Sequence, residues 1–489
     1  MKRTLAMLLT VAMLLGMAAV VQAEKPADVY TVRLGFPTML RIPDETSIKQ
    51  VEDAINNHIK NDLGINDLAL NIDFIPIWEY AASMNMALAS GESWDIVFTM
   101  GDLTTAVQNG YFTDLTPFLD NELAGAKEVI LDWLDCGTVG GVTYAIPCYK
   151  GQVLSWKYIY DKAFADAYDM STVHDLETLE KALAALKAAY PNEIFEVYNN
   201  QYHNLYSFRD HVSRVGNYLA TVGDSTKLVN YFETDAFKES CEVAYAHRQA
   251  GYADPEGSSN TLQHDAVIMS GASKGVIMGH AYSIDTVEKM FTMNNTYGAQ
   301  FGAVQIATSD MTTNILTYGI PYTTGNAAAS ARMMNLIWTD EFIASYLIYG
   351  VEGISWEWNE DRSSIRYPAG LTLDTVPYTA LYTCGAFGNQ FLLYGFDGNT
   401  SNADKVFMKE LIDNAWYPPL FGFMPDSNKV STQSAAVNNV YNQYFNALTY
   451  GDVNPDEYLP QFISAMQDAG LNDIIAEYQI QVDAWLANK

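Results

Sequence analysis

The chain has few positive charges, few cysteines and no long apolar run beyond its first residues. Lys and Arg together number 27 against 58 Asp and Glu, which gives a formal net charge of −31. This excess of negative charge excludes nucleic acid and anionic lipid surfaces as main partners, because both are polyanions. After residue 23, no stretch reaches the roughly 18 uninterrupted apolar residues that a membrane span needs.

Four cysteines are too few for a disulfide scaffold in a chain of 489 residues. Cys136 and Cys148 flank a glycine-rich turn at 137–141. This arrangement leaves two alternatives open, one disulfide across a hairpin or buried free thiols. None of the cysteines lies at the end of the N-terminal apolar run, so lipid attachment through an N-terminal cysteine is not expected.

Catalytic and cofactor motifs are also missing. The one Gly-x-Ser-x-Gly match, at 271–275, precedes an apolar run, whereas a nucleophile elbow follows its strand. The seven histidines form no zinc motif, and no phosphate-binding glycine loop is present. We therefore expect no catalytic residue, no metal and no cofactor. A glycoside hydrolase remains an alternative, since chance pairs among 58 acids could supply two carboxylates.

The N-terminus has the pattern of an export signal. Lys2 and Arg3 precede an apolar run from Leu5 to Val21, and the small residue Ala23 ends the segment. We expect a signal peptide over residues 1–23, cleaved after Ala23, and a periplasmic or extracellular protein. An uncleaved anchor is the alternative.

The first part of the mature chain alternates strand and helix patterns. Strands are expected at 30–36, 70–77 and 94–98, and helices at 48–63, 79–89 and 102–109. This order predicts parallel βαβ units, with ligands bound at the carboxyl ends of the strands. The loops at 37–40, 78–80 and 100–102 are therefore candidate binding loops.

The remainder of the chain is less regular. Residues 144–149 and 153–158 read as an extended pair, 172–189 and 235–250 as helices, and 274–279 and 302–306 as strands. A polar stretch rich in Tyr, His and Asn covers 199–210, and 325–349 reads as helical. The tail at 432–487 is expected to form three amphipathic helices, divided at Gly451 and Gly470.

Several ordered motifs resemble the extracellular solute-binding proteins of ABC importers, of the maltose-binding type. They are Gly-Glu-Ser-Trp-Asp-Ile-Val-Phe-Thr-Met-Gly-Asp at 91–102, Gly-Val-Thr-Tyr-Ala-Ile-Pro at 141–147 and Lys-Gly-Val-Ile-Met-Gly-His-Ala-Tyr at 274–282. Tyr-Gly-Val-Glu-Gly at 349–353, Ala-Phe-Gly-Asn-Gln-Phe at 386–391 and the tail from 423 resemble a subgroup associated with oligosaccharide uptake.

This resemblance implies an α/β fold of the periplasmic-binding-protein type II, with two lobes joined by hinge strands around a central cleft. It places residues 24–150 and 300–348 in lobe I, and 151–299 and 349–489 in lobe II, with a C-terminal helical region at about 423–489. Crossings between the lobes are expected near 148–155, 296–303 and 345–352. The implied function is capture of a carbohydrate by lobe closure and its delivery to the permease subunits of an ABC importer, by a monomer.

Aromatic residues make up 13% of the chain, with 32 Tyr and 9 Trp, which suits a binder of sugar rings. The candidate stacking platforms, for which core packing is the alternative, are Trp78, Tyr149, Trp156, Tyr282, Trp356 and Trp358. The candidates beside them are Asp102, His280, Asn389, Gln390, Thr38, Glu79 and Met100, and Asp102 is equally suited to cap the helix that follows it. The net charge keeps a binder of peptides or cationic solutes open as a further alternative.

Overall fold

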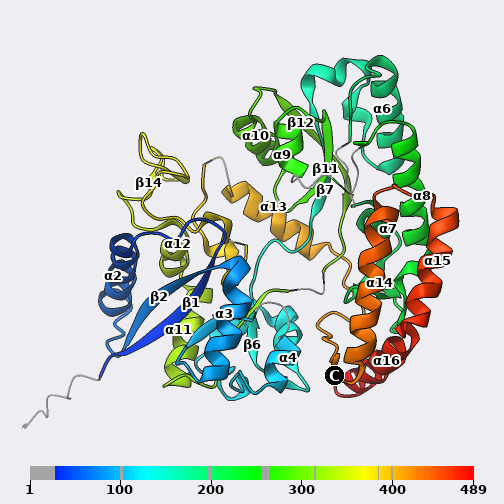
Figure 1. Cartoon of the computed structure of the whole chain (residues 1–489). Helices are drawn as coiled ribbons and strands as arrows, with labels where there is room; N and C mark the ends of the chain where they lie inside the picture. The colour runs from blue at the N-terminus through cyan, green and yellow to red at the C-terminus, as the bar shows by residue number, and fades with distance from the viewer. Residues whose placement is uncertain are drawn as a thin grey trace, which may run out of the picture.

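The structure is a computed structural model that describes residues 28–99, 103–196, 201–255, 259, 264–312, 315–383, 385–397 and 400–489. The expected signal peptide and the candidates Met100 and Asp102 lie outside these residues. The chain forms two α/β lobes side by side, with a bundle of C-terminal helices along lobe II (Figure 1).

Lobe I begins with the predicted alternation of strands and helices. Its first elements are β1 (Tyr30–Thr38), α2 (Glu45–Asn61), β2 (Leu68–Pro76), α3 (Ile77–Ser90), β3 (Ile96–Phe98) and α4 (Leu103–Gln108). Helix α2 begins where the Asp44 carboxylate accepts the backbone N–H of Ser47 at 2.9 Å, and it buries Val51, Ile55 and Ile59, which are spaced four residues apart. Strand β1 pairs in parallel with both β2 and β3, as predicted.

Two strands from later in the chain complete the lobe I sheet in the order β2-β1-β3-β13-β6. Strand β13 (Thr317–Gly319) runs antiparallel to β3 and to β6 (Ala145–Pro147). The other elements of this lobe are α5 (Ala124–Val129), β4 (Thr138–Val139), β5 (Val142–Thr143), α11 (Ala327–Thr339), α12 (Glu341–Tyr349), β14 (Glu357–Trp358) and β15 (Ile365–Arg366). Phe36, Val51 and Trp338 belong to its continuous apolar interior, here called the lobe I core.

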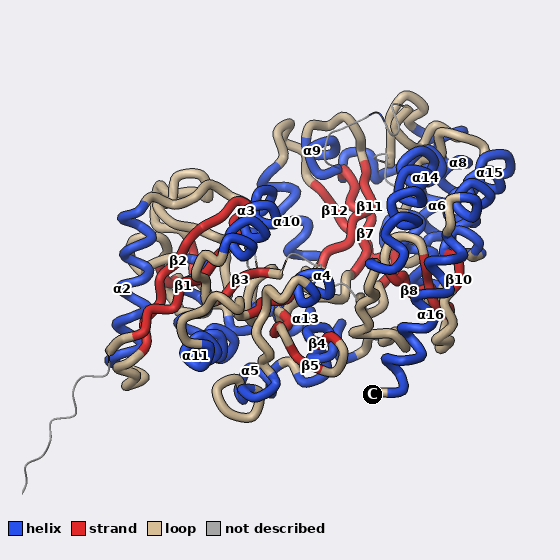
Figure 2. The backbone as a smooth tube through the Cα atoms, turned by 60° about the horizontal axis from the view of Figure 1, so that its bottom comes forward, coloured by secondary structure: helices blue, strands red, loops and turns tan. Residues whose placement is uncertain are grey.

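Lobe II contains two small antiparallel sheets. In one, β7 (Ser155–Asp161) lies between β11 (Gly275–His280) and β12 (Phe301–Thr308), which Figure 2 shows as three adjacent strands. The second joins β8 (Val212–Val215), β9 (Leu219–Val222) and β10 (Val229–Asn230). The helices are α6 (Leu176–Ala189), α7 (Tyr202–Arg209), α8 (Asp235–Gln249), α9 (His264–Met269) and α10 (Ile284–Asn294). Tyr158, Phe232 and Phe462 belong to the interior here called the lobe II core.

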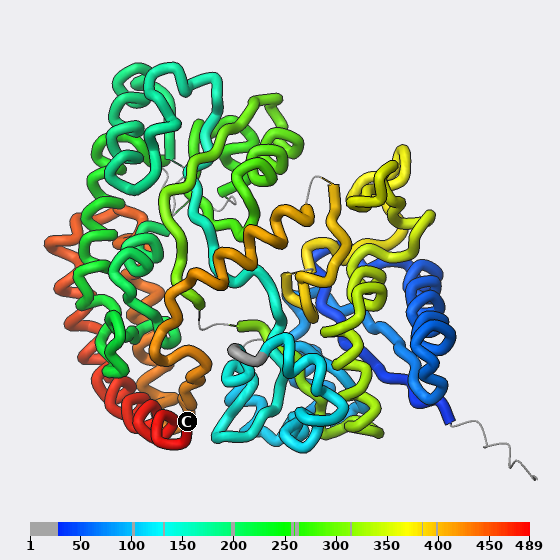
Figure 3. The backbone as a smooth tube through the Cα atoms, turned by 180° about the vertical axis from the view of Figure 1, so that it is seen from behind, coloured from blue at the N-terminus to red at the C-terminus, as the bar shows by residue number. Residues whose placement is uncertain are grey.

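The tail forms the three predicted helices, α14 (Ser431–Thr449), α15 (Pro455–Asp468) and α16 (Leu471–Ala487), after α13 (Asn402–Asp413). Gly451 and Gly470 separate them with positive φ angles of 66° and 101°, which residues with a Cβ rarely adopt. Seen from behind, the orange and red tail helices lie along the green α8 (Figure 3), and their side chains belong to the lobe II core.

The chain crosses between the lobes at positions that differ in part from the predicted ones. The first crossing joins β6 to β7, within the predicted range 148–155. The predicted crossing at 296–303 is wrong, because β12 extends to Thr308 within the lobe II sheet and the chain returns to lobe I only before β13.

The third predicted crossing, at 345–352, is also wrong. Residues up to Phe396 pack into the lobe I core, and the chain reaches lobe II only where Asp404 accepts hydrogen bonds from Ser283. Residues 300–308 therefore belong to lobe II and 349–396 to lobe I. The expected pairing of 144–149 with 153–158 is also wrong, because β6 lies in the lobe I sheet and β7 in a lobe II sheet.

Candidate functional site

A cleft of about 840 Å³ lies where lobe II meets the hinge. Its walls include α4 of lobe I, the two crossing segments that follow β6 and β12, and β7, α7, β8 and β11 of lobe II. The polar residues among its described lining are Thr104, Gln152, Gln201, Asn204, Ser207, Ser213, Arg214, Asn217, His264, Ser309, Asp310 and Thr312. This volume lies in the upper part of the range of small-molecule sites, about 300–1,000 Å³.

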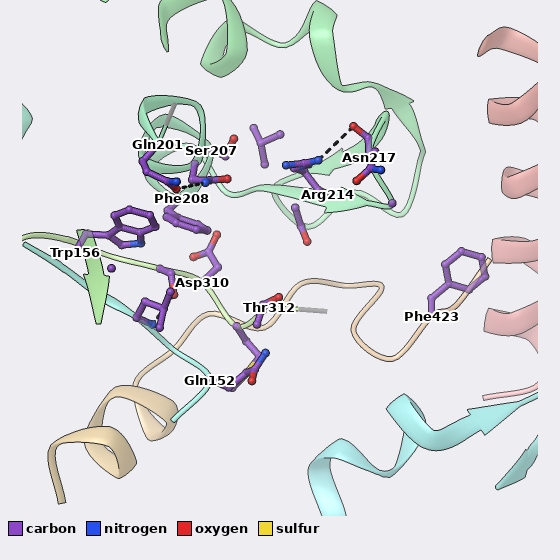
Figure 4. Close-up of a pocket in the computed structure, with 18 of the residues that line it drawn as sticks. Gln152, Trp156, Gln201, Ser207, Phe208, Arg214, Asn217, Asp310, Thr312 and Phe423 are labelled. Atoms are coloured by element: carbon purple, nitrogen blue, oxygen red, sulfur yellow. Dashed lines mark hydrogen bonds between the residues drawn. The ribbon is translucent and has the colours of Figure 1, made fainter. Parts of the chain in front are cut away.

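Two aromatic rings form one wall of the cleft. The rings of Trp156 on β7 and Phe208 on α7 lie 6.0 Å apart at 40° (Figure 4). Gly279 on the neighbouring strand makes room for the indole, because a Cβ at this position would lie 2.9 Å from Cε2 of Trp156. The indole Nε1–H of Trp156 is buried and has no hydrogen-bond partner among the described residues.

Helix α7 presents amide and hydroxyl groups beside these rings. Its cleft side carries Asn204, Ser207 and Phe208, with Gln201 directly before the helix. Its other side is held by buried rings, since the Tyr202 hydroxyl lies 3.0 Å from Nδ1 of His247 on α8. Helix α7 is therefore held by α8 on the side away from the cleft. Asn204 lines the cleft, whereas the hydroxyl of Ser207 donates to the His203 carbonyl at 2.5 Å and lies 3.1 Å from the Tyr231 hydroxyl.

A buried ion pair supports this attachment. Nδ1 of His247 lies 2.8 Å from the Glu196 carboxylate, and Nε2 lies 3.7 Å from that of Glu180. Burial by itself lowers the pKa of His247, but the two carboxylates outweigh it and raise the pKa to about 9. His247 is therefore a cation at neutral pH, behind the helix that lines the cleft.

Asp310 supplies a carboxylate to the cleft directly after β12. Its Oδ1 lies 3.0 Å from Nδ1 of His211, whose ring packs 4.5 Å from that of Trp416. Burial raises the pKa of Asp310 to about 6, although His211 opposes the shift. Its Oδ2 is buried without a hydrogen-bond partner among the described residues, and Figure 4 shows Asp310 between Trp156 and Thr312.

Of the described candidates from the sequence, Trp156 lines the cleft. The prediction of Trp356 as a platform is wrong, because its side chain is 1% exposed in the lobe I core and its Nε1 donates to the Gly350 carbonyl at 2.8 Å. Trp358 is only partly buried, but it packs on Tyr394 in the same aromatic cluster, away from the cleft.

Three candidates brace the first crossing instead of lining the cleft. The ring of Tyr149 lies 4.9 Å from that of Trp133 and 4.9 Å from that of Phe391. The Gln390 side-chain oxygen accepts the Gly151 N–H at 3.1 Å, and the Asn389 side chain caps the short helix that follows it. In this conformation these three side chains hold the hinge and are not part of the described cleft lining, and their role in ligand binding stays a prediction.

The other candidates lie at strand ends or directly after them, outside the cleft. Thr38 is buried and caps its own turn through Leu40, whereas Trp78 is 69% exposed and Glu79 is exposed beside it at the carboxyl edge of the lobe I sheet. The end of β11 carries His280, whose pKa is lowered to about 4 by burial and by Lys157. Tyr282 follows it, and its carbonyl accepts a hydrogen bond from the Lys157 ammonium at 2.9 Å.

The cleft also contains groups that the sequence predictions missed. The polar stretch at 199–210 was a usable signal, because a helix rich in amide groups and aromatics is unusual for a core. Asp310 and Gln152 had no local signal, since each lies on a crossing segment whose path depends on the whole fold. Among the described residues no group of three His, Cys, Asp or Glu is placed to hold a metal ion.

Two further expectations concern the cysteines and membrane helices. Cys136, Cys148 and Cys241 are free and buried, and burial raises the pKa of each thiol to about 12. Of the two alternatives for Cys136 and Cys148, the structure therefore shows buried free thiols and not a disulfide. No helix in the described part of the chain combines the length and apolarity needed to span a membrane.

Comparisons with known proteins agree with this architecture. A family described as a domain of unknown function (DUF3502) matches residues 419–487. A carbohydrate ABC transporter substrate-binding protein of Streptococcus pneumoniae serotype 4 (strain ATCC BAA-334 / TIGR4) is 25% identical over 429 residues, which cover 86% of this chain and 85% of that protein.

Solved structures share the whole fold. The N-glycan transport solute binding protein NgtS from Streptococcus pneumoniae gives a TM-score of 0.76 at 22% identity, with 94% of this chain and 99% of that chain covered. Its complexes with Man1GlcNAc and Man5GlcNAc give TM-scores of 0.67 and 0.66 over the same shares of both chains, also at 22% identity. The S. pneumoniae protein FusA in complex with kestose gives 0.60 at 15% identity and covers 94% of this chain and 100% of its own.

The two-lobe fold, the cleft at the hinge and a relative that matches most of both sequences agree with one another. The chain is similar in sequence to a carbohydrate ABC transporter substrate-binding protein and shares the fold of solute-binding proteins such as NgtS.

Proposed function

We propose that this protein binds an oligosaccharide in the cleft at the hinge and delivers it to the permease of an ABC importer outside the cytoplasm. The observation that carries this proposal is the pairing of an aromatic wall, Trp156 and Phe208, with the amide groups of Gln201 and Asn204 in one cleft. The name of the S. pneumoniae relative and the sugars bound by NgtS and FusA support the same ligand class.

The chemistry of sugars fits these walls. A pyranose ring has an apolar C–H face, which packs on an aromatic ring, and a rim of hydroxyl groups, which need donors and acceptors. In the cleft, the indole of Trp156 would pack on the apolar face of the sugar ring, while Asn204 and Asp310 would bind hydroxyl groups at its edge. The volume of about 840 Å³ suits a ligand of more than one ring.

We further propose that the structure is an open form. In two-lobed binding proteins, the lobes close around the ligand as rigid bodies that rotate about the segments joining them. The higher TM-score with the NgtS structure described without a ligand than with its two complexes supports an open conformation here. Closure would bring the carboxyl edge of the lobe I sheet, with exposed Trp78, toward the cleft.

The decisive experiment is calorimetric titration of the mature protein with Man1GlcNAc, Man5GlcNAc, kestose, short peptides and polyamines. We expect binding of an oligosaccharide without products on long incubation. Trp156→Ala should weaken binding about ten-fold, because a lost stacking contact costs about 0.5–1.5 kcal/mol in addition to its area. Tyr458→Ala, at an exposed aromatic on α15 outside the cleft lining, is the matched control.

Three results would contradict the proposal. They are a response only to peptides or polyamines, steady release of sugar products, and an unchanged affinity after Trp156→Ala. An oligosaccharide-binding protein that does not require Trp156 would place the binding surface elsewhere.

A further inference from the structure

The C-terminal region of unknown function reaches into the cleft. This region covers residues 419–487, and Phe423, Met424 and Pro425 near its start line the cavity. Figure 4 shows Phe423 on the opposite side of the pocket from Trp156, with Asp310 between them. The two ends of the cleft therefore come from different parts of the chain, β7 at one end and the C-terminal region at the other.

The wall of the cleft formed by Phe423, Met424 and Pro425 is attached on its C-terminal side to the tail helices. The ring of Phe423 packs against that of Trp485 on α16, with centroids 5.8 Å apart at 64°, and belongs to the lobe II core. The side chain of Gln481, also on α16, accepts the Asp426 N–H at 2.7 Å and donates to the Asp426 carbonyl at 2.9 Å. These contacts fix the backbone on the C-terminal side of the wall.

On its N-terminal side, the same wall packs against residues of lobe I. Gly422 has a φ of +87°, and a Cβ there would lie 2.5 Å from the Cβ of Asp135. The Asp135 carboxylate also forms an ion pair with Lys489, the last residue of the sequence, with 2.7 Å between Oδ2 and Nζ. Met424 packs against the lobe I core, although its neighbour Phe423 packs in the lobe II core.

We infer that the segment Gly422–Pro425 forms a distal subsite, so that the C-terminal region determines how long or how branched a bound ligand can be. The inference rests on the proposed function. The contacts with α16 hold this segment in lobe II, and Met424 and Pro425 offer the ligand an apolar surface. A short ligand that occupies the Trp156 end does not reach this wall, whereas a longer one contacts it.

The test compares a short and a long ligand of the same series, Man1GlcNAc and Man5GlcNAc, on the full mature chain. We expect Met424→Ala to weaken Man5GlcNAc about five-fold and to change Man1GlcNAc less than two-fold, because only the longer glycan loses apolar contact area. Met293→Ala removes a methionine that is 73% exposed on α10, outside the cleft lining, and should change neither affinity. If only the fructan series binds, sucrose and kestose form the short and long pair.

A second variant guards against a loss of folding. Gln481→Ala removes both hydrogen bonds to Asp426 without altering a cleft side chain, and it should give the same length-dependent loss. Thermal unfolding of each unliganded variant shows whether the fold is retained.

The outcomes separate this inference from the proposed function. If Trp156→Ala weakens both ligands while Met424→Ala and Gln481→Ala leave the ratio of the two affinities unchanged, the distal subsite is refuted and the proposed function stands. If the unmodified protein binds neither series, both are refuted.

Discussion

The buried ion pair behind α7 makes a quantitative prediction about stability and pH. The perturbation is His247→Gln, which removes the cation that faces Glu196 and Glu180. The pKa of His247 rises from 6.5 in the unfolded chain to about 9 in the fold. This difference corresponds to about 3 kcal/mol of unfolding free energy, fully present below pH 6.5 and lost as the pH rises through about 9.

The assay is urea unfolding followed by tryptophan fluorescence at pH 6 and at pH 9.5. At pH 6, His247→Gln should lower the unfolding free energy by about 3 kcal/mol, and at pH 9.5 the difference should be markedly smaller. His174→Gln is the matched control, since the His174 side chain is 72% exposed and its substitution should have little effect at either pH. A difference for His247→Gln that stays constant or grows with pH would refute this electrostatic reasoning.

Three further predictions follow from the cleft and its surroundings. Ligand affinity, measured by calorimetry, should fall as the pH drops through about 6, because protonation removes the negative charge of the Asp310 carboxylate. The Asp310→Asn variant should bind the ligand more weakly at pH 7.5 and should lose this pH dependence. If the variant kept the pH dependence, Asp310 would not be its cause. Gly279→Ala should cost about 1–3 kcal/mol of stability and weaken ligand binding, since its Cβ displaces the indole of Trp156; unchanged affinity would contradict this. A double-mutant cycle on Lys489 and Asp135 should give a coupling of about 0–1 kcal/mol, because both side chains are nearly half exposed; a larger value would show a stronger brace.

Much of the fold was predictable where local patterns are strong. The strands and helices from Tyr30 to Gln108 and the three tail helices match their sequence signals closely. Asp44 caps α2, and glycines separate the tail helices at 451 and 470, so these boundaries depend on neighbours in the chain. The α/β class and the two-lobe arrangement implied by the family resemblance are confirmed by the fold shared with NgtS.

The candidate site was less predictable, because an aromatic residue has the same local signature in a core and in a cleft. Trp156 and Trp356 are both buried tryptophans, 5% and 1% exposed, yet Trp156 borders the cleft and Trp356 lies within the lobe I core. Asn389 and Gln390 were expected to meet a ligand, but their polar groups satisfy the backbone of the hinge. Polar side chains near a cleft can serve either role, and the choice depends on which backbone groups are left without partners.

The sequence by itself determined the excess of negative charge, which depends on composition alone. It also predicted the export signal and determined the alternation of strands and helices, because these depend on residues close together in the chain. Only the tertiary structure decided which lobe each segment joins and which side chains meet in the cleft. The neighbours Phe423 and Met424 show the reason, because they pack into the interiors of different lobes. Their positions depend on contacts with residues far away in the chain, such as Trp485 for Phe423, which no local pattern records.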